Sequence, residues 1–249
     1  MKKTKAPEKH QFHDINKFPA ETGLLLFGIS MSKISNSQSA KKCFEYIEHL
    51  VCKIEKPHVG LNFIYSDYLY FNSDEQALAL KNKFQALMIA HKNEFQKILN
   101  KHKWYVQSAV AFMTWGQFIL EAKEFPAYLG KLKKLYETDE LFRQYLKKDA
   151  IDCGVELTEN QKLFFLEEIL LIYLVAKGRI ALHNDFVQGK EKWKLFCYPG
   201  KTLYSEIYLF QINPFKLSNP ENKYENSYYD LEEKKIYDFL NIDLKTFTT

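Results

Sequence analysis

The sequence of 249 residues predicts a single α/β domain, with a mostly parallel sheet flanked by helices. Two short apolar runs without polar alternation, 23–30 and 59–65, suit strands that are buried on both faces. Between them, apolar side chains recur every three or four residues over 40–54, which predicts an amphipathic helix that ends before Pro57. A strand, a helix and a strand at this spacing form a βαβ unit with parallel strands and a right-handed connection.

The third part of the pattern is a long helix that begins at Ser73 or Asp74 and runs to about His102. A third strand is expected over 104–112, and helical segments are expected over 117–150.

The most apolar helix of the chain covers 163–176. Thr158 and Gln161 form a capping box before it, and Lys177-Gly178 ends it. A further strand is expected over 193–198. The segment 203–212 fits either a last strand or a short helix.

We expect three parts along the chain. Residues 1–20 form a flexible basic arm, 21–218 form the α/β domain, and 219–249 form a tail that packs on or near this domain.

The composition describes a packed protein of ordinary surface charge. Glycine (9) and proline (7) are few and aromatic residues make up 16% of the chain, which excludes a disordered protein. The net charge of +4 permits a polyanionic partner but does not require one. None of the four cysteines forms a C-x-x-C pair, so we expect no metal site and reduced cysteines in a cytoplasmic protein. We find no signal peptide and no apolar run long enough for a membrane span.

Ser30 is the first candidate for chemistry. It follows Gly28 at the carboxyl end of the first predicted strand, where open α/β sheets bind ligands. We interpret Ser30 as a nucleophile, with N–H groups of the following turn as oxyanion donors. The alternative is that Ser30 only caps a turn.

Lysines of the long helix form the second candidate. Lys83, Lys97 and Lys101 cluster on its polar side, and Lys81 and Lys92 belong to a second row on one flank. The pattern suits a phosphate-binding ridge, and it equally suits a solvated helix face.

Glu167 and Glu168 lie within the apolar helix and point about 100° apart. If Glu168 points inward, burial raises its pKa, and it can then move a proton or hold an ammonium group. The alternative is that both glutamates reach water or pair with a lysine. A further candidate is Tyr198, which ends the strand over 193–198 before Pro199-Gly200. Its phenol lies near Ser30 if the two strands are neighbours; otherwise it is a core tyrosine before a turn.

Together these motifs resemble the tRNA-dependent cyclodipeptide synthases. A Gly-x-Ser step, a Glu-Glu pair in an apolar helix and a Tyr-Pro-Gly turn occur in this order over about residues 23–205. The resemblance implies a Rossmann-like catalytic domain similar to that of class I aminoacyl-tRNA synthetases. It implies a transferase that makes a cyclic dipeptide (diketopiperazine) from two aminoacyl-tRNAs, through aminoacyl-serine and dipeptidyl-serine intermediates. ATP is not used, and we expect no cofactor.

Residue by residue, the resemblance makes Ser30 the nucleophile, Glu168 the catalytic glutamate and Tyr198 the tyrosine that positions or relays protons. One branch of the family has asparagine three residues after the serine and histidine after the tyrosine. This chain has Lys33 and Pro199 there, so it resembles the other branch, which is marked by Tyr-Pro.

One residue departs from the family pattern. The family usually has a tyrosine four residues before the glutamate, and this chain has Phe164. Tyr173 or Tyr198 then holds the substrate amino group, or activity is weakened. A second alignment places Tyr173 at the tyrosine position, but it replaces the glutamate by Lys177, so we prefer Glu168.

The expected pocket for the first amino acid is apolar and suits an apolar or aromatic side chain; its candidate residues are Leu26, Gly28, Leu171 and Phe196. The expected partners are two aminoacyl-tRNAs, which bind along the lysine helix. We expect the protein to be a monomer that binds neither DNA nor a membrane. The alternatives are a non-catalytic tRNA-binding relative of class I synthetases, a synthetase, or a serine hydrolase. The sequence lacks the second glycine of G-x-S-x-G that a hydrolase would favour.

Overall fold

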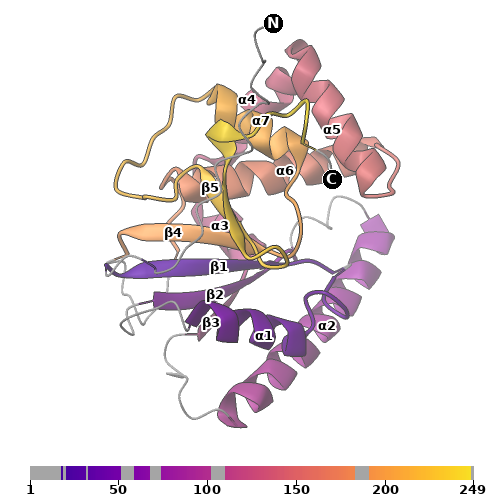
Figure 1. Cartoon of the computed structure of the whole chain (residues 1–249). Helices are drawn as coiled ribbons and strands as arrows, with labels where there is room; N and C mark the ends of the chain where they lie inside the picture. The colour runs from indigo at the N-terminus through magenta and orange to yellow at the C-terminus, as the bar shows by residue number, and fades with distance from the viewer. Residues whose placement is uncertain are drawn as a thin grey trace, which may run out of the picture.

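The computed structural model describes residues 18, 21–31, 33–51, 59–67, 74–101, 110–182 and 191–247. Its centre is a six-stranded sheet in the order β3-β2-β1-β4-β5-β6 (Figure 1). Every neighbouring pair is parallel except β5 and β6, which confirms the predicted α/β fold with a mostly parallel sheet. The strands are β1 (Gly23–Ile29), β2 (Val59–Tyr65), β3 (Val110–Thr114), β4 (Trp193–Tyr198), β5 (Ser227–Asp230) and β6 (Lys235–Asp238).

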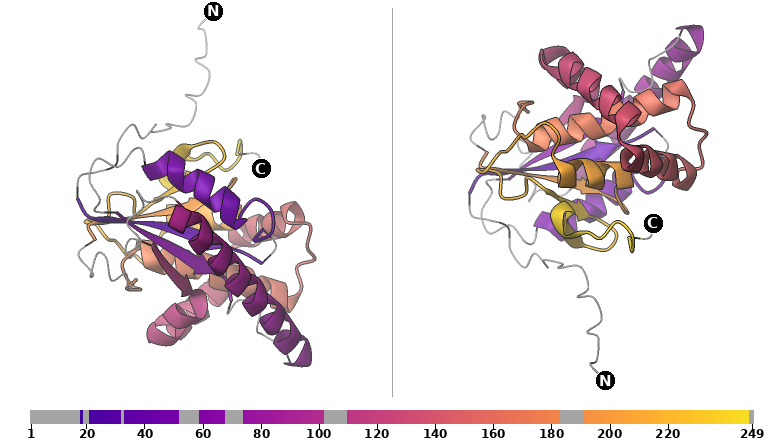
Figure 2. Two further views of the ribbon diagram at one scale, coloured as in Figure 1. Left: turned by 90° about the horizontal axis from the view of Figure 1, so that it is seen from below. Right: turned by 90° about the horizontal axis from the view of Figure 1, so that it is seen from above.

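Helices cover both faces of the sheet. The helices α1 and α2 lie on one face and α3 to α7 on the other, as the views from below and above also show (Figures 1 and 2). The helices are α1 (Ala40–Val51), α2 (Asp74–Lys101), α3 (Trp115–Glu121), α4 (Phe125–Thr138), α5 (Glu140–Asp152), α6 (Glu159–Ala176), α7 (Tyr204–Ile212) and the short 3-10 helix η3 (Phe239–Asn241).

The strand β1 divides the core in two, because successive side chains point to opposite faces. Leu24 and Leu26 pack with the helices α3 to α7, whereas Leu25 and Phe27 pack with α1 and α2. All four are at most 1% exposed, as expected for a strand without polar alternation. A Cβ on Gly23 would lie 1.9 Å from the Trp193 ring, so only glycine lets β4 approach here.

The apolar helix α6 lies against the sheet and is buried on nearly every side, since Leu166, Ile169 and Leu170 are 0% exposed. Thr158 begins it as predicted: its hydroxyl oxygen accepts from the backbone N of Gln161 at 3.2 Å. Gly178 follows the helix at φ 70°, a conformation that favours glycine.

Other segments differ from the sequence-based expectation or extend it. Of the two alternatives for 203–212, the helix is correct. The described third strand begins at Val110; residues 104–109 of the predicted segment lie outside the described residues. The region 219–249, expected as a tail, contributes β5 and β6 to the sheet. Apart from Phe18, which stacks on Trp193, the arm 1–20 lies outside the described residues.

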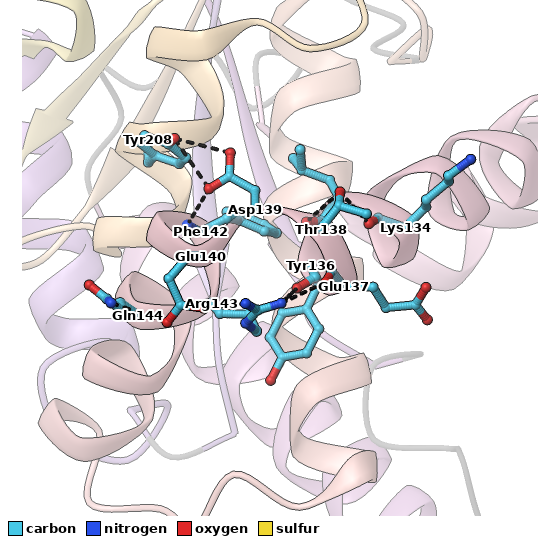
Figure 3. Close-up of polar contacts among 11 residues, drawn as sticks. Lys134, Tyr136, Glu137, Thr138, Asp139, Glu140, Phe142, Arg143, Gln144 and Tyr208 are labelled. Atoms are coloured by element: carbon cyan, nitrogen blue, oxygen red, sulfur yellow. Dashed lines mark hydrogen bonds and ion pairs between the residues drawn. The ribbon is translucent and has the colours of Figure 1, made fainter.

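Polar contacts fix the corner between α4 and α5 (Figure 3). The Asp139 carboxylate caps α5 by accepting from the backbone N of Phe142 at 3.0 Å. It also accepts from the Tyr208 hydroxyl of α7 at 3.1 Å. The Asp139 carboxylate thus joins α5 and α7, directly after the end of α4, on the side of the sheet that carries α6.

Within the described residues, no helix has both the length and the apolar character that crossing a membrane requires.

Candidate functional site

Ser30 and Tyr198 lie at the carboxyl ends of adjacent strands, because β1 and β4 pair in parallel with Phe27 opposite Cys197. By strand alternation, Gly28 and Tyr198 belong to the face that α6 covers, and Ser30 follows the end of β1. A Cβ on Gly28 would lie 3.8 Å from Cδ2 of Tyr198, so the phenol ring lies over Gly28. The condition that the two strands are neighbours is therefore met.

The turn after β1 surrounds Ser30, which is 9% exposed. The carbonyl of Ser30 accepts from the backbone N of Lys33 at 3.2 Å and of Ile34 at 3.0 Å. These two N–H groups are engaged within the turn, and the role of other N–H groups of this turn as oxyanion donors stays a prediction. The Ser30 hydroxyl lies 3.4 Å from Oε1 of Gln38.

Lys33 crosses the mouth of the site. Its Nζ lies 4.2 Å from the centroid of the Tyr198 ring and donates to the carbonyl of Pro199 at 3.3 Å. Burial lowers the pKa of Lys33, while the negative charges of Glu232 and Glu168 oppose this shift. The site therefore contains a partly desolvated ammonium group.

Glu168 reaches the same region from α6. Burial raises the pKa of Glu168 to about 7, and the positive charge of Lys33 works against that increase. Its carboxyl is thus within electrostatic reach of Lys33, and both protonation states are populated near neutral pH. One turn earlier, the half-buried Phe164 packs edge-on against Phe165 and supplies no hydroxyl.

Two further acids lie behind Glu168. The pKa of Glu206 is raised to about 8 by burial, and the charge of Glu168 adds to this increase. Burial also raises the pKa of Asp149, to about 6. Glu206 accepts from the Thr202 hydroxyl at 2.5 Å, and Asp149 caps α7 by accepting from the backbone N of Tyr204 at 2.7 Å. The described residues contain no cluster of three or more His, Cys, Asp or Glu side chains that could bind a metal ion.

The predicted pocket residues fall into two groups. Leu26 and Phe196 lie on the sheet face under α6, beside Gly28 and Tyr198, and Leu171 is a fully buried residue of the same core. Tyr173 instead donates its hydroxyl to Asn213 and packs against Phe210 and Phe215. Lys177, the alternative to the glutamate, pairs with Glu225 at 2.6 Å. The charge of Glu168 therefore acts on Lys33, whereas Tyr173 and Lys177, the residues of the second alignment, have other partners.

The lysine helix is α2, on the opposite face of the sheet (Figure 1). Lys83, Lys92, Lys97 and Lys101 are exposed along it, and the side chain of Lys81 lies outside the described part of the chain. Lys92 lies 5.3 Å from the ring of Phe112. This charged surface is available to a polyanion.

Sequence reasoning missed Gln38 and His91, both buried beside the Ser30 turn. Gln38 stands in a polar run, 35–39, that resembles any loop before a helix. His91 lies where α2 alternates between exposed and buried positions. The spacing of apolar residues can place His91 on the buried side of α2, but it cannot show that His91 contacts the Ser30 turn.

No protein-family model and no curated protein matches the sequence. Solved structures are nevertheless similar. A CDPS from Fluoribacter dumoffii is 14% identical, with a TM-score of 0.55 over 83% of this chain and 91% of that one. A CDPS from Staphylococcus haemolyticus is 11% identical, with a TM-score of 0.53 over 81% and 87%. A cyclodipeptide synthase from Bacillus thermoamylovorans is 17% identical, with a TM-score of 0.51 over 84% and 87%. The chain therefore has the fold of cyclodipeptide synthase structures.

Proposed function

We propose that the protein is a cyclodipeptide synthase that joins the amino acids of two aminoacyl-tRNAs. The observation that carries the proposal is the arrangement around Lys33, which lies over Tyr198, within electrostatic reach of Glu168 and three residues after Ser30. The shared fold with cyclodipeptide synthase structures supports it. The Lys33 and Tyr198-Pro199 pattern supports assignment to the Tyr-Pro branch.

In the first step, Oγ of Ser30 attacks the ester carbonyl of the first aminoacyl-tRNA. The bond to the 3′ oxygen breaks, the tRNA leaves with a proton, and the amino acid remains as an ester of Ser30. The nearby Lys33 ammonium stabilises the negative charge that develops on the carbonyl oxygen, because the site is largely shielded from water.

In the second step, the α-amine of the aminoacyl-serine attacks the ester carbonyl of the second aminoacyl-tRNA. The second tRNA leaves, and a dipeptidyl ester remains on Ser30. The free amine of the dipeptide then attacks that ester, which closes the six-membered ring and returns the hydroxyl of Ser30. All three acyl transfers balance without ATP, metal or redox cofactor.

Glu168 holds the substrate ammonium when ionised and accepts its proton before the amine attacks. Its raised pKa suits this exchange near neutral pH. Tyr198 lies over Gly28 and positions the amine during ring closure. The exposed lysines of α2 bind the acceptor stem through phosphate contacts, so the affinity for tRNA should fall as the salt concentration rises. We also expect the protein to act as a monomer.

Expression of the chain in a bacterium, followed by mass spectrometry of the medium, tests the proposal. We expect diketopiperazines from the wild type and from the control variant Ser35→Ala, which changes an exposed serine of the same turn. We expect none from Ser30→Ala. Unchanged product from Ser30→Ala would contradict the nucleophile. Retention of tRNA without product would favour a non-catalytic relative, and tRNA-independent ester hydrolysis would favour a hydrolase.

A further inference from the structure

The ladder between β1 and β4 stops one step before the catalytic turn. In a parallel ladder, every second residue of a strand bonds to the same neighbouring strand: it donates its N–H to the residue before its partner and accepts from the residue after it. Continuing the register of Phe27 and Cys197 places Pro199 opposite Ile29. Pro199 would then have to donate to the carbonyl of Gly28 and accept from the N–H of Ser30. Proline has no N–H, so the strand cannot complete this step.

The side chain of Gln38 makes both missing bonds. Its Nε2 donates to the carbonyl of Gly28 at 2.6 Å, and its Oε1 accepts from the backbone N of Ser30 at 2.8 Å. The carbonyl of Pro199 accepts from Lys33 instead. Gln38 and Pro199 line the same small recess at this edge of the sheet, so the amide lies near the proline whose main-chain bonds it replaces.

Gln38 is itself held from three directions, and its side chain is buried, at 1% exposed. Its N–H donates to the carbonyl of Lys33 at 2.9 Å, and its own carbonyl accepts from Nε2 of His91 at 2.9 Å. Because a carbonyl can only accept, Nε2 of His91 carries the hydrogen, and Nδ1 accepts from the Tyr65 hydroxyl at 2.8 Å. The lysine helix α2 is thereby connected to the Ser30 turn.

We infer that Gln38 is a positioning residue for the nucleophile: its amide replaces the main-chain pairing that Pro199 cannot provide and fixes the backbone of Ser30. This inference rests on the proposed function for its kinetic part. Two bonds to residues on either side of Ile29 fix the backbone from which the side chain of Ser30 projects. A displacement of about 1 Å at a reacting atom costs about 100-fold in rate.

The kinetic test compares Gln38→Ala with Gln211→Ala. Gln211 is a matched control, because its amide also donates to two main-chain carbonyls, of Phe239 and Ile242, but far from Ser30. For Gln38→Ala we expect kcat for the cyclic dipeptide to fall about 10- to 100-fold, with the KM for aminoacyl-tRNA within about twofold of wild type. Equal kcat values for the two variants, each per folded protein, would overturn the inference.

The variant Gln38→Glu gives a second readout if the alanine variant folds poorly. Its carboxyl can donate to Gly28 only when protonated, so its activity relative to wild type should rise as the pH falls. A merely structural loss would not follow this protonation. A ratio that stays constant with pH would overturn the inference.

Amide hydrogen exchange separates the inference from the proposed function. In Gln38→Ala, exchange in the segment 28–31 should be at least about tenfold faster than in Gln211→Ala, because Ser30 N–H has lost its acceptor. This result does not depend on activity. If the wild type made no product, the proposed function would fail while exchange still decided whether Gln38 holds the turn; unchanged exchange would refute it.

Discussion

The ammonium of Lys33 lies 4.2 Å from the centroid of the Tyr198 ring, and its charge also acts on Glu168. The side chain of Lys33 thus interacts with both Tyr198, at the end of β4, and Glu168, on α6. Its burial leaves the ammonium with fewer water contacts, so the ring and the carboxylates carry more of its stabilisation.

The first prediction concerns the pH dependence set by this pair. Glu168 must be ionised to hold an ammonium group, so kcat/KM should rise with pH through the pKa of about 7. Lys33 opposes the raised pKa, so Lys33→Met should shift this rise to higher pH, whereas Lys33→Arg, which keeps the charge, should not. Rate profiles from pH 5 to 9 measure the midpoint; the same midpoint in all three proteins would contradict the coupling.

The second prediction separates the neighbouring glutamates. Glu168→Gln should lower kcat by about 100-fold or more, because the amide cannot accept the amine proton. Glu167→Gln is the matched control: Glu167 is 5% exposed, and burial raises its pKa to about 7.

Ionising Glu167 therefore costs stability as the pH rises from about 4.5 through 7. Glu167→Gln should retain activity and be more stable than wild type at pH 8, but not at pH 5. Product analysis and urea unfolding at both pH values decide this. Equal kinetic losses in both variants would remove the distinction.

The third prediction concerns the support of α7. Asp149 accepts from the backbone N of Tyr204 and Ser205 and from the Ser205 hydroxyl, although Leu203 at the N-cap provides no side-chain bond. Asp149→Ala should therefore lower the free energy of unfolding by about 1–3 kcal/mol. Urea unfolding measures the loss, with the exposed Asp152→Ala on the same helix as control. A loss no greater than that of the control would argue against the cap.

The fourth prediction tests the charge of α2. Reversal of Lys83, Lys97 and Lys101 to glutamate should raise the KM for aminoacyl-tRNA and reduce its dependence on salt, with a smaller effect on kcat. Lys134→Glu on α4, also exposed, is the control. If the triple variant matched Lys134→Glu at every salt concentration, the lysines would be a solvated face only.

The sequence was sufficient for elements whose pattern is local. The runs 59–65 and 193–198 are confirmed as strands with those bounds, because both are short, largely apolar and rich in aromatic residues. The helix α6 is also confirmed, since its N-cap, Thr158, and the residue that it caps, Gln161, are only three residues apart in the sequence.

Contacts across the sequence could not be read in this way. The pairing of β1 with β4 joins residues about 170 positions apart, and the sequence supported it only as a condition. Strands β5 and β6 are each only four residues long, and their tyrosines stand among polar and acidic residues, a composition that also suits a surface tail. The roles of Gln38 and His91 depend on a proline that is 161 residues after Gln38, which no local pattern reveals.

The position of β4 between β1 and β5 has a consequence for synthesis on the ribosome. The Ser30 turn and its support from His91 can form once α2 has been translated. Tyr198 arrives only with β4, and β4 gains its outer neighbour only with β5. Nascent chains that have not yet emerged to residue 230 should therefore carry an open sheet edge beside an unfinished site. If the proposed function holds, Ser30 should become reactive only in the final stage of translation, so that incomplete chains are not acylated.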